Sequence, residues 1–190
     1  ILIEAFVLVI KELVGRKLPL EKLPILFCNT KIIGNMGWDL FELLHCYLFK
    51  HDLDINLSNS IIGRCINSEY NPENNPRLPP MLSDNTYNNI LNSADVFVST
   101  QSGEGWGLCN FEASCIGLPQ VAPKCMGLVE FLNDDNSILI EPKYTLFEHY
   151  GVDGIGGEID LVDPADVARG MLAYYDSAEL RERHGECAKQ

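Results

Sequence analysis

The fold is decided by residues 93–132, SADVFVSTQSGEGWGLCNFEASCIGLPQVAPKCMGLVEFL. Residues 95–99 are apolar at their centre, which predicts a strand that is covered on both faces. A glycine-rich loop follows, then a helix over 107–116 that Gly117 would end, and then a second strand over 119–122. The stretch therefore predicts a strand, a loop, a helix and a strand of one α/β sheet.

The same alternation continues on both sides of this stretch. Residues 67–82 contain four prolines and four asparagines and predict an irregular loop, and residues 141–158 predict a glycine-rich excursion. We predict further strands over 24–28, 60–66 and 137–140, and helices over 1–15, 35–50, 84–92, 128–132, 164–175 and from 178 onward. Alternating strands and helices predict the α/β class, with a Rossmann-like parallel sheet and helices on both faces.

Two carboxylates bracket the loop and the helix of the central stretch, at Glu104 and Glu112. Carboxylates accept hydrogen bonds from hydroxyls, and the unpaired N–H groups at a helix start attract an anion such as phosphate. Ligands of such sheets bind beyond the carboxyl ends of the strands, so loops 100–106 and 123–127 should face one crevice. The pattern predicts a pocket for a ligand that carries both phosphate and sugar hydroxyls.

Composition excludes several classes of partner. The chain has 190 residues, a net charge of −13 and 46% hydrophobic residues, as in a soluble globular protein. The charge argues against nucleic acids and against anionic membrane surfaces, since both are bound through Lys and Arg. The apolar opening is too short for a membrane span and lacks the basic start of a signal peptide. The seven cysteines match no zinc spacing and are interpreted as plain buried thiols in a reducing compartment.

Four other features have ordinary structural interpretations. The glycines of 154–157 do not lie between a strand and a helix, so we reject a dinucleotide fingerprint there. Asp134 and Asp135 are interpreted as a turn and not as a metal site. Lys124 could place a cation near the second loop, but an exposed lysine is the simpler interpretation. His45 is expected at the boundary of the core.

The motif resembles the donor-binding core of retaining GT-B glycosyltransferases, family four, also called glycosyl transferases group 1. The order and spacing agree over 94–99, 104–108, 112–113, 117–122 and 126–130. Trp106 stands where that family usually has phenylalanine, and Met126-Gly127 replaces a pair of glycines. Ser114-Cys115 replaces a pair of small apolar residues. None of these departures removes a carboxylate.

The resemblance implies a role for each motif residue. Glu104 would hold hydroxyls of the donor sugar near the reacting centre, as the catalytic residue, and Glu112 would hold the ribose. Trp106, between two glycines, would either pack in the core or form part of the pocket wall. The donor-binding set implied by the resemblance is Glu104, Gly105, Trp106, Gly107, Leu108, Glu112, Met126 and Gly127. No metal and no cofactor are implied, because the nucleoside-diphosphate sugar is itself the substrate.

The resemblance also implies how the chain is organised. Residues 1–190 would form a C-terminal nucleotide-sugar-binding domain, one half of a GT-B fold, located in the cytoplasm. Because Ile1 falls within a predicted helix, we expect the chain to be truncated at its N-terminus. The upstream loop with Arg and Lys for the diphosphate, and an N-terminal domain for the acceptor glycan, lipid or protein, would be missing. Alone, this chain would then bind nucleotide weakly and transfer no sugar.

Two alternatives remain beside retaining transfer of a sugar to an acceptor hydroxyl. One is a GT-B-type epimerase or phosphorylase, which shares the architecture. The other is a non-catalytic fragment that binds nucleotide sugars. The sequence leaves open the base, the sugar and the acceptor.

Overall fold

The computed structural model describes residues 1–28, 39–64, 83–150 and 155–189. The chain forms two compact units, one made of Ile1–Ala5 with Ile90–Gln190 and the other of Phe6–Asn89. The first helix, α1 (Leu2–Gly15), and the helix α4 (Asp84–Ser93) each contribute to both units. Within the described residues, no helix is long and apolar enough to cross a membrane.

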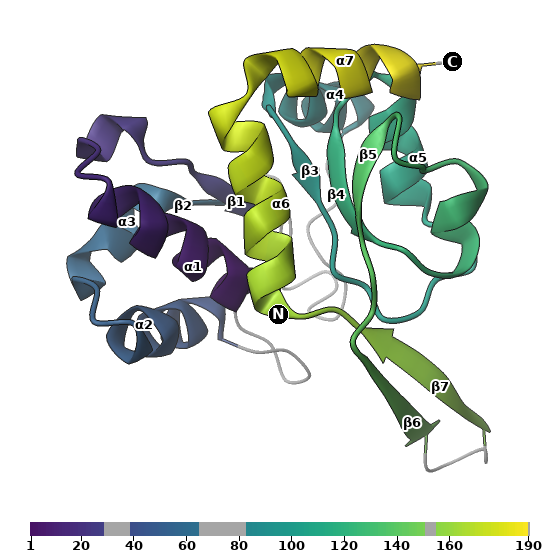
Figure 1. The fold of residues 1–190 in the computed structure, drawn as a ribbon, viewed down its shortest axis with the longest axis horizontal. Helices are drawn as coiled ribbons and strands as arrows, with labels where there is room; N and C mark the ends of the chain where they lie inside the picture. The colour runs from purple at the N-terminus through teal and green to yellow at the C-terminus, as the bar shows by residue number, and fades with distance from the viewer. Residues whose placement is uncertain (29–38, 65–82, 151–154, 190) are drawn as a thin grey trace. The chain divides into compact units, whose positions relative to one another are not determined.

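The larger unit is built on a three-stranded parallel sheet, whose strands lie side by side in Figure 1. The strands are β3 (Phe97–Val98), β4 (Gln120–Pro123) and β5 (Ser137–Ile140), in the order β3-β4-β5. Phe97 pairs with Gln120, and Val121 pairs with Ile138. All four residues of β4 are buried, as expected of the central strand of a covered sheet.

Helices cover both faces of this sheet. The Gln120 side chain hydrogen-bonds to α5 (Leu108–Cys115), whereas a Cβ atom at Gly170 of α6 (Pro164–Asp176) would lie 3.0 Å from the Val121 side chain. Because neighbouring residues of a strand point to opposite faces, α5 and α6 lie on opposite sides of β4. The predicted Rossmann-like α/β class is confirmed.

Local capping signals place several helix ends where the sequence predicts them. The Asp163 side chain accepts a hydrogen bond from the Ala165 N–H, and Pro164 occupies the first helical position of α6. Gly117 follows α5 with a φ of 76°, in the left-handed region that glycine adopts at little cost. A second C-terminal helix, α7 (Ala178–Ala188), follows α6, with Ser177 as its cap.

The smaller unit has a two-stranded parallel sheet in which Leu26 pairs with Ile62. Its remaining elements are η1 (Leu20–Lys22), β1 (Leu26–Cys28), α2 (Leu40–Lys50), η2 (Ile55–Leu57), α3 (Ser58–Ile61) and β2 (Ile62–Arg64). The predicted buried strand over 24–28 is half exposed, since Phe27 retains 42% of its accessible surface. The predicted strand over 60–66 begins within α3, and the predicted loop over 67–82 lies outside the described residues.

Residues 144–161 correct the prediction of a glycine-rich excursion. They form an antiparallel hairpin of β6 (Tyr144–Tyr150) and β7 (Ile155–Leu161). Tyr144 pairs with Leu161 and Leu146 with Ile159, so these apolar residues share one face. The composition of the segment, with its glycines, hid this period of two. Since Gly156 and Gly157 lie within β7, the rejected dinucleotide fingerprint is indeed absent from those two positions.

The interpretation of the cysteines as buried thiols is wrong for most of them. Among the six that the structure describes, only Cys125 is buried, and Cys46, Cys109 and Cys115 are exposed. Helix α5 turns Asn110, Ala113 and Ser114 inward, and this orientation leaves its two cysteines outside. Cys65 lies outside the described residues.

Candidate functional site

A buried amide network anchors the loop between β3 and α5. Asn110 is only 1% exposed, and its Nδ2 donates to Ser99 Oγ and to Gln120 Oε1, both at 2.9 Å. Its Oδ1 accepts from Gln101 Nε2 at 3.1 Å. One side chain thus joins the end of β3, the start of the loop and the first residue of β4. Asn110 is not among the residues predicted from the sequence, although a glutamine inside the apolar segment of β4 signals a buried polar partner.

The start of α5 depends on Gly107. This residue has φ 80° and ψ 59°, and no side chain caps the helix. A Cβ atom on residue 107 would lie 2.5 Å from Leu128 Cδ2, so glycine also permits close packing against the second loop. The first N–H groups of α5 have no partner within the helix, and the helix dipole makes this end attractive to an anion.

The two predicted loops are in direct backbone contact. A Cβ atom on Gly127 would lie 2.1 Å from the carbonyl oxygen of Gly105 and 2.9 Å from the Cα of Trp106. Only a bare backbone fits between them. Because β3 and β4 are parallel neighbours, both loops leave the same edge of the sheet. The predicted proximity of loops 100–106 and 123–127 is confirmed.

The second loop continues as η3 (Met126–Glu130), a 3-10 helix that replaces the helix predicted over 128–132. Met126 lies in the left-handed region with a φ of 50°, and its Sδ accepts from the Glu104 N–H at 3.1 Å. A five-residue 3-10 helix sums few peptide dipoles, so this start attracts an anion less than α5 does.

The two carboxylates of the motif are exposed. Glu104 packs over the helix start, with its Cγ 3.5 Å from where a Cβ of Gly107 would be. Glu112 follows Leu108 by four residues and shares its side of α5, and Leu108 is 66% exposed. Glu104 therefore lies beside the helix start and next to Met126 of the second loop, and Glu112 lies one helical turn further along α5 than Leu108.

Trp106 packs against two phenylalanines and keeps part of its ring exposed. Its ring centroid lies 5.8 Å from that of Phe111 and 5.3 Å from that of Phe131, and these two phenylalanines meet edge to face at 5.4 Å. Such contacts fix the ring. Trp106 nevertheless stays 43% exposed, so one part of the indole packs while the other faces solvent.

The root of the hairpin reaches the same loop. The Asp160 N–H of β7 donates to the Ser102 carbonyl oxygen at 3.1 Å. Burial raises the pKa of the Cys125 thiol, and the nearby Asp160 carboxylate raises it further. The loop from Ser99 to Gly107 is therefore held at its start by Asn110, in its middle by β7 and at its end by α5.

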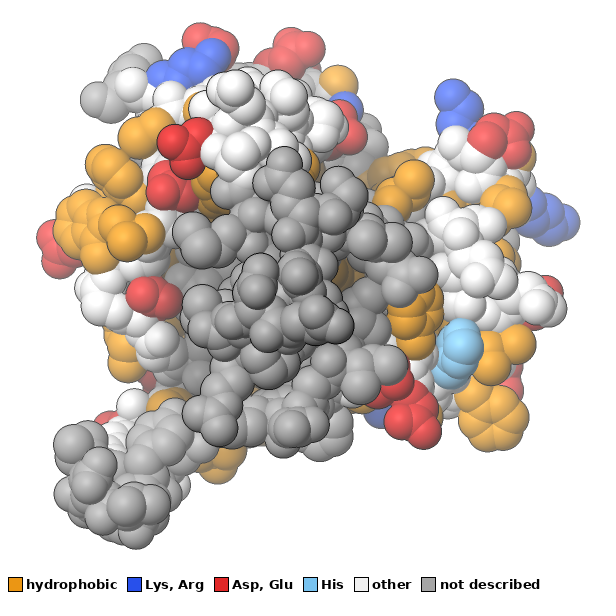
Figure 2. All heavy atoms as spheres, turned by 180° about the vertical axis from the view of Figure 1, so that it is seen from behind, with side chains coloured by type: hydrophobic (Ala, Val, Ile, Leu, Met, Phe, Trp, Pro, Cys, Tyr) orange, Lys and Arg blue, Asp and Glu red, His pale blue; other side chains and the backbone are white. Residues whose placement is uncertain are grey.

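Lysines near the crevice are engaged by carboxylates. Lys124 pairs with Glu141 at 2.5 Å, and that hydrogen bond raises the pKa of the ammonium group. Lys143 pairs with Asp163 and Asp166, each at 3.0 Å. On the face drawn in Figure 2, basic side chains of the described part of the chain are scattered.

His45, Asp134 and Asp135, which the sequence assigns to structural roles, have local hydrogen-bonding partners or lie in a turn. His45 is half-buried, and its Nε2 lies 3.0 Å from Ser58 Oγ. Asp134 and Asp135 lie in a turn in which the Asp135 N–H donates to Asn133 Oδ1. Among the residues with described placement, no three of the His, Cys, Asp and Glu side chains group as metal ligands would.

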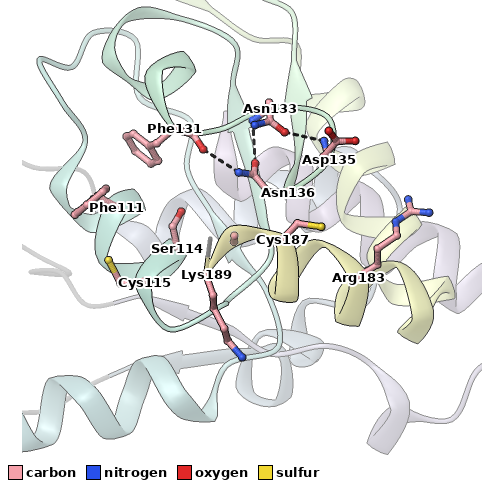
Figure 3. Close-up of a pocket in the computed structure, with 11 residues that line it drawn as sticks. Phe111, Ser114, Cys115, Phe131, Asn133, Asp135, Asn136, Arg183, Cys187 and Lys189 are labelled. Carbon is pink, nitrogen blue, oxygen red and sulfur yellow. Dashed lines mark hydrogen bonds between the residues drawn. The ribbon is translucent and has the colours of Figure 1, made fainter.

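A hollow of about 660 Å³ lies between α5, α7 and the turn at 133–136 (Figure 3). Its lining includes Phe111 and Phe131 but neither Glu104 nor Glu112. Arg183 and Lys189 extend away from its centre, and the Asn136 side chain is bonded to the Phe131 carbonyl. Of the residues predicted to bind the donor, none lines this hollow.

Comparison with known families agrees with the site. A model of the family described as Glycosyl transferases group 1 matches residues 44–149, more than half of the 190 residues. The matched region contains both loops, α5 and the whole three-stranded sheet. Among curated proteins, none matches the chain. The extent of the family match shows that this chain belongs to the glycosyl transferases group 1 family.

Proposed function

We propose that this chain is the donor-binding half of a retaining GT-B glycosyltransferase, and that the crevice between the two loops binds a nucleoside-diphosphate sugar. One observation carries the proposal: the loop with Glu104 and the loop with Met126 meet backbone to backbone at Gly127 and Gly105. This contact brings together motif residues that lie more than twenty positions apart in the sequence. Family membership makes a glycosyl donor the expected ligand.

Each part of the donor has a chemically suited neighbour. The diphosphate would lie at the start of α5, where the N–H groups of Leu108 and its neighbours are oriented by the helix. Glu104, at the crevice, would accept hydrogen bonds from hydroxyls of the sugar. Glu112, one turn further on, would accept hydrogen bonds from the ribose hydroxyls. Trp106 would present its exposed edge as a wall of the pocket.

The reaction follows from this placement. The bond between the anomeric carbon and the diphosphate oxygen breaks, and the nucleoside diphosphate leaves with the electron pair. A new bond forms from the acceptor oxygen on the same face, and the acceptor proton is released. Helix-start N–H groups stabilise the charge on the leaving group, and Glu104 orients the sugar ring. We propose that an N-terminal GT-B domain provides the acceptor site.

The test compares nucleotides with nucleotide sugars by isothermal titration calorimetry. UDP, GDP and ADP are titrated first, and then the sugar derivatives of whichever base binds. We expect Glu112→Gln to weaken free nucleotide about tenfold, since one charge-assisted hydrogen bond is worth about 1.5 kcal/mol or more. Glu104→Gln should leave free nucleotide nearly unchanged and weaken the nucleotide sugar by a similar factor. Glu182→Gln, an exposed glutamate on α7, is the matched control.

The outcomes separate the proposal from its rivals. Equal effects of both substitutions on free nucleotide would contradict the assigned roles. Binding without sugar transfer, even with an N-terminal domain supplied, would favour a non-catalytic nucleotide-sugar-binding protein. Interconversion of the donor sugar, or its release to phosphate, would favour an epimerase or a phosphorylase.

A further inference from the structure

Met126 adopts a backbone conformation that usually belongs to glycine. Its φ of 50° is in the left-handed region, which disfavours a residue with a side chain and costs glycine little. Two other non-glycine residues in the described part of the chain share such a φ, Lys17 and Asp52, and neither lies in the crevice. A methionine at such a position indicates that its side chain provides something that a glycine could not.

The side chain bridges the two loops. Met126 Sδ lies 3.1 Å from the backbone nitrogen of Glu104, and a Cβ atom on Gly103 would lie 3.8 Å from both Sδ and Cε. The thioether therefore lies across the peptide between Gly103 and Glu104. Met126 stays 43% exposed, so part of its side chain faces solvent beside the first loop.

This bridge adds to the backbone contact at Gly127. That contact fixes the second loop against Gly105 but leaves Glu104 itself without an anchor on the second loop. The N–H···S bond supplies the anchor at the residue whose carboxylate matters for the sugar. Thioether sulfur is a weak acceptor, yet an unbranched methionine adapts its shape to a gap between loops.

We propose that Met126 is a positioning and specificity-determining residue for the donor sugar, an inference that rests on the proposed function. Through the Glu104 N–H it fixes the carboxylate that holds the sugar hydroxyls. Through its exposed part it narrows the crevice beside Gly103, so that the compact sugars are favoured over sugars with a bulky substituent. The nucleotide moiety, which contacts α5 and Glu112, is unaffected.

The experiment uses three variants of the full chain. Met126→Leu keeps an apolar side chain of four heavy atoms and removes the sulfur acceptor, and Met126→Gly removes the side chain altogether. Met171→Leu, on α6, is the matched control. The probes are the nucleoside diphosphate alone, its unsubstituted hexose derivative and its N-acetylhexosamine derivative, each titrated by calorimetry.

We expect Met126→Leu to bind the nucleotide as wild type does and the hexose derivative about fivefold more weakly, which is the loss of one neutral hydrogen bond. Met126→Gly should show the same loss for the hexose derivative and an increased preference for the N-acetylhexosamine derivative. A merely structural role would weaken nucleotide and nucleotide sugar equally. Wild-type affinities and selectivity in both variants would overturn the proposal.

A second measurement does not depend on any ligand. Amide hydrogen exchange at Glu104 should become about fivefold faster in Met126→Leu, with exchange in β4 unchanged. If wild type binds no nucleotide sugar but Glu104 exchange changes in this way, the proposed function fails while the positioning role stands. Unchanged exchange at Glu104 would overturn the positioning role whatever binds.

Discussion

A close contact between two glycine backbones lies beside each end of α5, and the surroundings of the two contacts differ. Beside its N-terminal end, Gly127 packs on the backbone of Gly105, where a Cβ atom would be 2.1 Å from the carbonyl oxygen. Beside its C-terminal end, Gly185 of α7 packs on Gly117, where a Cβ atom would be 2.4 Å from the carbonyl oxygen. Both contacts join segments that are distant in the sequence through bare backbone.

What surrounds each contact is different. Near the first, Trp106, Leu108 and Met126 keep much of their surface exposed. Near the second, Tyr174 and His184 are buried and lie 2.8 Å apart. From this difference we expect the N-terminal end to serve ligand binding and the C-terminal end to serve stability. Substitutions at the two ends should separate these properties.

The largest effect is expected for Gly127→Ala. The added methyl group collides with the backbone of the first loop, which cannot move as a flexible side chain would. We expect the loops to separate, donor binding to fall below detection by calorimetry, and the free energy of unfolding in urea to drop by about 3 kcal/mol.

Gly185→Ala is the matched control at the other end. It makes a similar collision, partly offset by the better helix propensity of alanine, worth about 1 kcal/mol. It should lower the free energy of unfolding by about 2 kcal/mol and leave the donor affinity of the folded protein unchanged. Loss of donor binding in Gly185→Ala as well would show that the two ends are not separable.

The next largest effect is expected for Asn110→Ala. The change removes the amide donor to two buried acceptors, Gln120 Oε1 and Ser99 Oγ, so the free energy of unfolding should fall by about 2 kcal/mol. Gln101→Ala removes only the hydrogen bond between Gln101 of the loop and Asn110, so it should lower the free energy of unfolding less than Asn110→Ala does. Both variants should bind the donor more weakly than wild type. Calorimetry measures the donor affinity, and urea unfolding measures the stability. A donor affinity equal to wild type in Gln101→Ala would show that the hydrogen bond between Gln101 and Asn110 does not position the loop.

Local signals explain which parts of this molecule could be predicted. Asp163 and Pro164 mark the start of α6, and Gly117 marks the end of α5, because caps act within a few residues. The strand over 137–140 was predicted with its observed bounds. The two loops could be assigned to one edge because parallel strands end together.

The remaining features depend on contacts between distant segments. No local sequence signal predicts that Gly127 contacts Gly105, that the Asn110 side chain hydrogen-bonds to three others, or that Met126 accepts from the Glu104 N–H. The hairpin was missed because glycines in one strand hid an alternation that is clear once its partner strand is known. The cysteines were misjudged because a residue type was taken as evidence of burial, whereas the orientation of α5 decides it.

The smallest effect concerns the pH dependence of stability and the buried His184 near the C-terminal end of α5. Burial lowers the pKa of His184 below its ordinary value of about 6.5, and the neighbouring Arg183 lowers it further, while Asp135 and Asp134 act in the opposite direction. Nδ1 faces the Tyr174 hydroxyl at 2.8 Å, and Nε2 faces the Arg183 guanidinium at 3.5 Å. A proton on Nε2 would therefore point at a cation, which favours the neutral ring.

The direction of the pH dependence follows from this depressed pKa. Between the folded-state pKa of His184 and about 6.5, the unfolded chain binds more protons than the folded one, so stability falls as pH decreases through that window. Urea unfolding at pH 7.5 and pH 5.5 should show this loss in wild type and a smaller loss in His184→Asn, which stays neutral. An equal loss in both proteins would assign the pH dependence to other groups. Nucleotide affinity per folded molecule should show no contribution from His184, because this residue belongs to the end of α5 that serves stability.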